Sequence, residues 1–248
     1  VGPFVFFDHM GPVDMPARIP KTVDVRPPPH IGLSTLTYLF EGEITHRDSL
    51  GVQQDIRPAE VNWMTAGSGV THSERFERAR REGARLEGIQ AWVALPDGQE
   101  EIDPSFQHVG TAELPTWSED GIKGRLAAGE AFGMKAGVST FSPLHYLHLE
   151  LEPGARFQTP TDHSESAVYV VSGLVEIDDG RPLGHGQMAV LEKKIASVVC
   201  ALEPSTIMVL GGEPVGERFI DWNFVSSSKD RIEQAKADWR AGRMKLPD

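Results

Sequence analysis

The sequence predicts an all-β chain of two tandem jelly-roll β-barrels, followed by one amphipathic helix. Three observations support this fold class. A strand, glycine, strand pattern in the first half recurs in the second half. Short segments rich in β-branched and aromatic residues are bounded by Gly and Pro, which is typical of strands and turns. The final residues change from the period of a strand to that of a helix.

The internal repeat is carried by two pairs of segments. Residues 38–44, Tyr-Leu-Phe-Glu-Gly-Glu-Ile, correspond to residues 169–177, at an offset of 131 residues (169 − 38). Downstream, residues 57–64 correspond to residues 184–191. Because this offset is the size of one domain, the repeat predicts two barrels of the double-sheet kind.

The elements of the first barrel follow from local composition. Aromatic and β-branched residues predict strands, and Gly or Pro residues mark the turns between them. The charged stretch 74–88 has few apolar positions and is expected to be a surface loop. The expected strands lie within residues 4–7, 31–44, 56–64 and 86–95.

Domain limits are expected where composition changes. Residues 96–124 are rich in Pro, Asp, Glu and Gly and are the best candidate for a linker. We therefore expect an N-terminal barrel in residues 1–115, a C-terminal barrel in residues 116–225 and a helical tail in residues 226–248.

The tail has a helical period. Ile232, Ala235 and Trp239 fall on one face of a helix, residues 226–228 are serines that could cap its start, and Gly242 is a plausible end. One amphipathic helix is therefore expected to pack on the barrels.

Composition excludes two classes of protein. The 248 residues are 40% hydrophobic and contain no apolar run of the roughly 18 residues that a membrane span needs. The net charge is −12, which argues against direct binding of nucleic acid, because neutralising phosphates requires clustered cations. The one basic cluster, residues 78–81, is flanked by glutamates and is expected to be a solvated loop.

The number of cysteines and the first residues of the chain indicate the cellular compartment of the protein. Cys200 is the only cysteine, so no disulfide can form within the chain, which is consistent with a reducing compartment such as the cytoplasm. No charged and then apolar secretion signal opens the sequence. The start at Val1 is abrupt, and the sequence leaves open whether the chain is a truncated or processed form.

Three potential metal ligands lie in the first barrel. His72 and Glu74 are two residues apart, so they face the same side if the backbone there is extended. With His30 they form a set of two imidazoles and one carboxylate, the ligand type that suits non-haem Fe(II). The alternative is that His30 and His72 are ordinary histidines at strand ends and Glu74 is a solvated carboxylate.

Several motifs together resemble the pirin family of two-domain cupins. They are Asp-His-Met-Gly-Pro at residues 8–12, the His-Ile-Gly turn at 30–32, Tyr-Leu-Phe-Glu-Gly at 38–42, His-Arg-Asp-Ser-Leu-Gly at 46–51, the long segment from Trp63 to Glu74, and residues 221–225. The resemblance covers nearly the whole chain. It implies a cupin fold, a tail that returns to the N-terminal domain, and an additional segment before the residue that is Val1 here.

The resemblance also implies a metal site. The family usually holds one iron through two histidines of a His-Pro-His turn, a third histidine and a glutamate, at positions that correspond to 28, 30, 72 and 74 here. Pro28 offers no donor atom, so His30, His72 and Glu74 remain. Either three protein ligands hold Fe(II) or another divalent transition metal, or His9 or His46 replaces the missing ligand, or no metal binds.

The second barrel lacks the ligand set. On the alignment of Tyr38 with Tyr169, His30 corresponds to Thr161 and Pro28 to Thr159. Its histidines are scattered along the sequence, and we expect this barrel to be structural or to bind a partner. They are His145, His148, His163 and His185.

Three functions are consistent with this pattern. The resemblance implies a quercetin 2,3-dioxygenase-like enzyme that uses Fe(II) and O2 on a flavonol or similar phenol, with His30 and His72 as metal holders and Glu74 also acting as general base. The second is an iron- or redox-dependent regulator that binds a transcription factor or metabolic enzyme. The third is a metal-free pseudo-cupin, because of Pro28.

Overall fold

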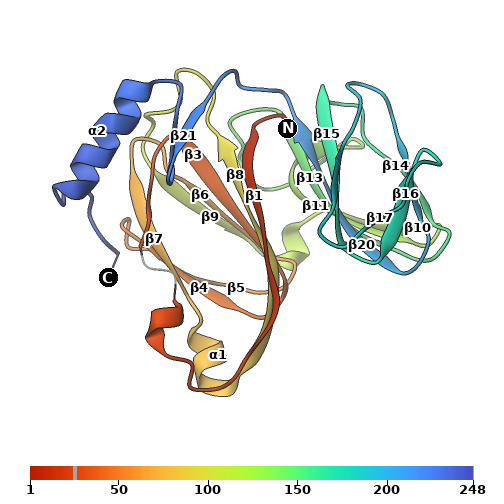
Figure 1. Ribbon diagram of the computed structural model, residues 1–248, viewed down its shortest axis with the longest axis horizontal. Helices are drawn as coiled ribbons and strands as arrows, with labels where there is room; N and C mark the ends of the chain where they lie inside the picture. Colours follow the sequence, from red (N-terminus) through yellow and green to blue (C-terminus); the bar gives the residue numbers. More distant parts are fainter. Residues whose placement is uncertain (25–26, 248) are drawn as a thin grey trace. The chain divides into compact units, whose positions relative to one another are not determined.

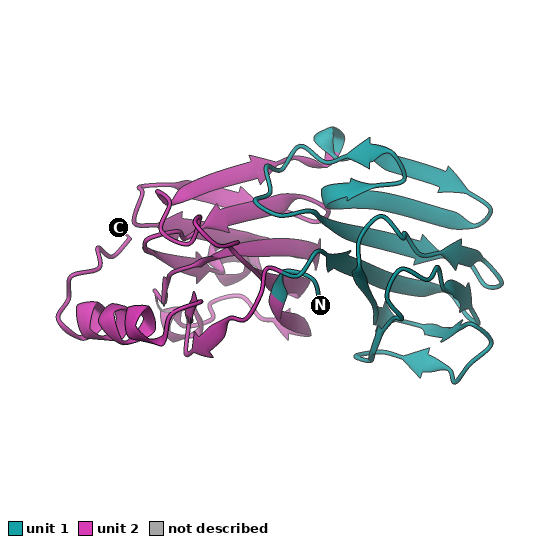
Figure 2. Cartoon of the chain, turned by 90° about the horizontal axis from the view of Figure 1, so that it is seen from above, with its two compact units in different colours: residues 1–4, 112–214 teal, residues 5–111, 215–248 magenta. Residues whose placement is uncertain are grey.

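The computed structural model describes residues 1–24 and 27–247, and it separates into two compact units. The C-terminal barrel consists of residues 1–4 and 112–214, and the N-terminal barrel consists of residues 5–111 and 215–248. Figure 2 shows the C-terminal barrel in teal and the N-terminal barrel in magenta. Both units are discontinuous in sequence, whereas the predicted domains were continuous. The predicted limits at 115 and 225 stay predictions.

The N-terminal barrel is built from a five-stranded and a four-stranded antiparallel sheet (Figure 1). The five-stranded sheet has the order β1 (Phe4–Met15), β8 (Ala84–Ala94), β3 (Leu33–Glu41), β6 (Val61–Thr65) and β9 (Ser105–Val109). The four-stranded sheet has the order β2 (Pro29–His30), β7 (Val70–Arg75), β4 (Ile44–Asp48) and β5 (Gln53–Ile56). A 3₁₀ helix, η1 (Lys21–Val23), and a short helix, α1 (Glu77–Glu82), complete the first part of this unit.

The C-terminal barrel repeats this design. Its larger sheet has the order β10 (Thr116–Glu119), β11 (Ile122–Ala131), β13 (Leu144–Leu151), β20 (Ser205–Gly212), β15 (Glu165–Ser172) and β18 (Met188–Val190), with β12 (Met134–Lys135) paired to β11. Its smaller sheet has the order β14 (Arg156–Gln158), β19 (Val198–Ala201), β16 (Leu174–Ile177) and β17 (Leu183–Gly184). A 3₁₀ helix, η2 (Thr111–Glu113), precedes the larger sheet.

The repeat in the sequence is a repeat in the topology. In the N-terminal barrel β3 lies between β8 and β6, and in the C-terminal barrel β15 lies between β20 and β18. Both strands, β3 and β15, are buried along most of their length. The prediction of two jelly-roll barrels from this repeat is confirmed.

The tail forms the predicted helix. After the hairpin of β21 (Phe219–Asp221) and β22 (Phe224–Ser226), α2 spans Lys229–Arg240, and its N-cap Ser228 accepts a hydrogen bond from the Arg231 backbone. Ile232 and Ala235 are buried against Ile31 and Phe224. The helix therefore packs on the N-terminal barrel, as the resemblance implied.

The expected linker and the expected loop both contain regular elements. The boundary between the two units, at residues 111 and 112, does fall within the expected linker. Part of the expected linker forms β9, which pairs with β6 because Phe106 and Val109 add apolar contacts to the barrel. Part of the expected loop 74–88 forms α1, where Ala79 is buried and Arg80 pairs with Asp24 at 2.6 Å. In both segments a few apolar residues among many polar ones suffice to fix an element at the barrel surface.

Within the described residues, no helix has the length and apolar character needed to cross a membrane.

Candidate metal centre

The pairing of two strands places four polar side chains, His46, Asp48, His72 and Glu74, next to one another. On the neighbouring strands β4 and β7, His46 lies opposite Glu74 and Asp48 lies opposite His72. Side chains two residues apart share a face, so these four point to the same side. His30 ends β2, which pairs with the other edge of β7. His30, His46, His72 and Glu74 are each at most 5% exposed.

His30 and His72 meet directly. Their Nε2 atoms are 3.1 Å apart. Nδ1 of His30 lies 3.0 Å from the backbone oxygen of Asn223. Since a carbonyl oxygen only accepts, this Nδ1 carries the hydrogen and donates it, which leaves a lone pair on Nε2 of the neutral ring. The Nε2 atom of His30 therefore faces His72 with a lone pair that can bind a metal ion.

Burial keeps both rings neutral. It lowers the pKa of His30 to about 4, against a smaller raising effect of the hydrogen bond to Asn223. Burial, followed by repulsion from His30 and His46, holds the pKa of His72 well below its ordinary value. A neutral imidazole is the form that binds a metal ion, so neither histidine must lose a proton near neutral pH.

The two nitrogens fit one metal ion. Two nitrogens that each lie about 2.1 Å from a metal and at right angles to one another are separated by about 3.0 Å. The observed separation of 3.1 Å agrees with this value. The bond from His30 to Asn223 is also the outer contact that a metal-bound histidine commonly makes. His72 has no such contact: its Nδ1 is buried without a hydrogen-bond partner among the described residues.

Glu74 faces the same region but is turned to other partners. Its Oε1 accepts hydrogen bonds from Gln90 at 2.7 Å and from Thr37 at 3.4 Å. Burial raises the pKa of Glu74, while the charge of His46 and these two hydrogen bonds lower it by less. In the described part of the chain no three His, Cys, Asp or Glu side chains converge as a ready metal site. Two of the three predicted ligands thus meet, and Glu74 would have to rotate to join them.

Pro28 lies where the missing ligand would be. Its carbonyl oxygen accepts a hydrogen bond from the backbone of His72 at 3.3 Å, so a histidine at position 28 would stand opposite His72. Of the two suggested replacements, His46 stacks on His72 with ring centroids 5.4 Å apart, and its Nε2 contacts Asp48 at 3.0 Å. His9 instead contacts Glu87. His46 is the replacement that the structure places nearby.

The sequence did not single out four residues that shape this site. Asn223 orients His30, and Gln90 holds Glu74. Trp92 lies edge-on to His30 at 5.2 Å, and Phe106 stacks on His46 at 4.5 Å. Each looks like an ordinary strand or hairpin residue in the sequence. Only the pairing of distant strands reveals the contacts.

The C-terminal barrel holds a second histidine pair. His145 and His163 stack with ring centroids 5.5 Å apart, so these two are not scattered in space as they are in the sequence. Nε2 of His145 lies 3.2 Å from Oγ of Ser166. Burial, and then the nearby His163, lower the pKa of His145 to about 3.

This shift predicts loss of stability in acid. Between pH 6.5 and about 3 the unfolded chain binds a proton at His145 that the folded chain does not, so acidification favours unfolding. At about 1.4 kcal/mol per pKa unit, His145 should contribute up to about 5 kcal/mol to this loss. His145→Gln keeps a partner for Ser166 but does not titrate, so its free energy of unfolding should fall less with pH. Urea unfolding across this range measures the difference, and equal slopes for both proteins would contradict the prediction.

Comparison with protein families gives two matches. The model of the pirin family matches residues 1–93, and the model of the pirin C-terminal cupin domain matches residues 146–245. A pirin-like protein of Caulobacter vibrioides is 65% identical over 249 aligned positions, which cover 100% of this chain and 86% of that protein.

Solved structures give similar results. A quercetin 2,3-dioxygenase from Acinetobacter baumannii is 32% identical with a TM-score of 0.89, and the match covers 98% of this chain and 79% of that one. A bacterial pirin from Escherichia coli, solved in complex with nickel(II), is 20% identical with a TM-score of 0.61 and covers 77% of each chain. At that identity the second structure shows a shared fold only.

Proposed function

This chain belongs to the pirin family of two-domain cupins, and from that premise we propose that it is a quercetin 2,3-dioxygenase-like enzyme that uses Fe(II) and O2. Its substrate is a flavonol or a similar enolisable phenol. The observation that carries the proposal is the convergence of two buried, neutral imidazoles at 3.1 Å beside a buried carboxylate. The similarity to a quercetin 2,3-dioxygenase along 98% of the chain supports the same class of reaction.

Three side chains would hold the metal. His30 and His72 supply nitrogens of neutral rings that are already close together, and Glu74 supplies the negative charge once it turns away from Gln90. Bound Fe(II) would supply Lewis acidity and a position for O2. Two imidazoles with one carboxylate are the donor set that suits this metal.

Glu74 is also the candidate base. Burial raises its pKa, so the protonated form costs less here than in water and the carboxylate can accept a proton from a phenolic hydroxyl. When the Glu74 carboxylate is released from the metal, the hydrogen bonds from Gln90 and Thr37 orient it as the base. The near-complete burial of these groups excludes water from the reacting atoms, and it also requires side chains over the site to rearrange before a flavonol can enter.

A metal-free cupin that acts by binding a protein partner is the second candidate. Two observations favour it. Pro28, opposite His72, has no side-chain donor atom for a metal. The Glu74 carboxylate already accepts a hydrogen bond from Gln90, so it does not need a metal as partner. An iron-dependent regulator would retain metal but show no turnover.

Oxygen consumption tests the enzyme directly. The chain, reconstituted with Fe(II) under anaerobic conditions, should take up O2 when a flavonol such as quercetin is added. Glu74→Gln should lower this rate by about 100-fold or more, because the amide neither accepts the proton nor supplies the negative charge to the metal. The matched control is Glu87→Gln, which removes one carboxylate of β8 that contacts His9. If the protein retains iron but takes up no O2 when the flavonol is added, the proposal of an enzyme is wrong and an iron-dependent regulator is favoured.

A further inference from the structure

A cavity of about 350 Å³ opens in the C-terminal barrel, apart from the candidate metal centre. It is lined by residues of β10, β11, β12 and β14 and of the turns after β10 and β11. Its volume lies at the lower end of the range for small-molecule sites, about 300–1,000 Å³. The cavity therefore has room for a small metabolite.

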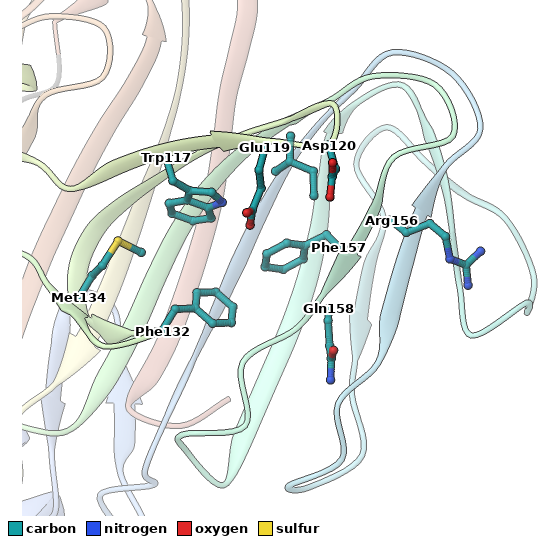
Figure 3. Close-up of a pocket in the computed structure, with 9 residues that line it drawn as sticks. Trp117, Glu119, Asp120, Phe132, Met134, Arg156, Phe157 and Gln158 are labelled. Atoms are coloured by element: carbon teal, nitrogen blue, oxygen red, sulfur yellow. The ribbon is translucent and has the colours of Figure 1, made fainter.

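Three aromatic rings form its wall (Figure 3). The ring centroids of Trp117 and Phe132 are 6.1 Å apart, and those of Phe132 and Phe157 are 5.9 Å apart, both in edge-to-face geometry. Phe157 is buried, whereas Phe132 remains 46% exposed. Such an arrangement presents ring faces in different directions around one hollow.

The backbone is adapted to hold these rings. Trp117 lies opposite Gly124 in the strand register, and a Cβ at Gly124 would come within 2.1 Å of the Trp117 ring. Only glycine lets the indole lie flat at this position. Phe132 has a φ of 52°, which is unusual for a bulky residue, and its ring lines the cavity.

Two carboxylates give the aromatic cavity a charge. Glu119 and Asp120 line it, and neither has an ion-pair or hydrogen-bond partner among the described residues. In Figure 3 the Glu119 side chain points toward the hollow bordered by the rings, while the guanidinium of Arg156 points away from it. An apolar hollow with aromatic faces and unpaired carboxylates is complementary to an organic cation.

We propose that this cavity binds a small organic cation with a quaternary or tertiary ammonium group, with Trp117, Phe132 and Phe157 against its methyl groups and Glu119 as counter-ion. A neutral aromatic ligand would use the rings but not the carboxylates. A metal ion would use the carboxylates but not the rings. The cation uses both.

The test uses the whole chain and a pair of probes that differ in charge alone. Choline and its neutral isostere 3,3-dimethylbutan-1-ol are titrated separately into ¹⁵N-labelled protein at low ionic strength, and the indole N–H signals of the five tryptophans are followed. The Trp117 signal is identified by its absence in Trp117→Leu. Choline should shift this signal saturably, and the isostere should bind at least about tenfold more weakly.

Two variants and one control sharpen the test. Glu119→Gln should weaken choline binding about fivefold or more, and Phe132→Asn, which suits a positive φ but lacks the ring, should weaken it by a similar factor. Glu150→Gln, an exposed carboxylate of the same barrel outside the cavity, should leave binding unchanged. Equal affinity for choline and the isostere, or no saturable shift of the Trp117 signal, would overturn the proposal.

Discussion

Replacing Phe224 by Ala is expected to lower the free energy of unfolding of the chain by about 3–5 kcal/mol. Phe224 is fully buried in the cluster with Ile31, Ile232 and Ala235, and its strand forms a β-bridge to Ile31. Truncation leaves a cavity at the point where the tail joins the N-terminal barrel. Urea unfolding measures the change.

The matched control is Ile220→Ala in the same hairpin. Ile220 is 47% exposed, so its truncation should cost about 1 kcal/mol or less. Phe224→Ala should also reduce iron retention, because the neighbouring Asn223 carbonyl orients His30. A loss of stability no larger than that of the control would show that Phe224 does not anchor the tail.

Replacing His72 by Ala is expected to reduce iron retention from near one equivalent to background. His72 stands at the centre of the site: its ring contacts both His30 and His46, and its backbone bonds to Pro28. Removing this ring leaves His30 with no second nitrogen within the predicted set. Iron content after reconstitution and desalting is the measurement.

His108→Ala is the matched control for this loss. His108 lies on β9 in the same barrel, where it contacts Asn62 at 2.8 Å and Glu60 at 3.8 Å. Its loss should leave the iron content unchanged. Equal iron content in His72→Ala and the unaltered chain would place the metal elsewhere.

The fold was largely predictable because its signals are local or repeated. The offset between Tyr38 and Tyr169 predicted two barrels, and the spacing of Ile232, Ala235 and Trp239 predicted the helix. The β9 strand was missed because one apolar pair, Phe106 and Val109, is too weak a pattern to recognise among polar neighbours.

The candidate site was predictable only in part. The spacing of His72 and Glu74 correctly indicated a shared face, and the family resemblance brought His30 to it. The direction of the Glu74 carboxylate depends on Gln90, which comes from a different sheet. The orientation of His30 depends on a carbonyl 193 residues away. Such contacts leave no periodic signal in a sequence.

Iron stoichiometry of the unaltered chain, compared with Pro28→His, tests the central claim most directly. Both proteins are reconstituted anaerobically with Fe(II) and desalted. We predict near one iron per molecule in the unaltered chain, held by His30, His72 and Glu74, and tighter retention in Pro28→His, because a fourth donor would stand opposite His72. Iron in Pro28→His alone would contradict the account: the natural chain would then be a cupin without its metal.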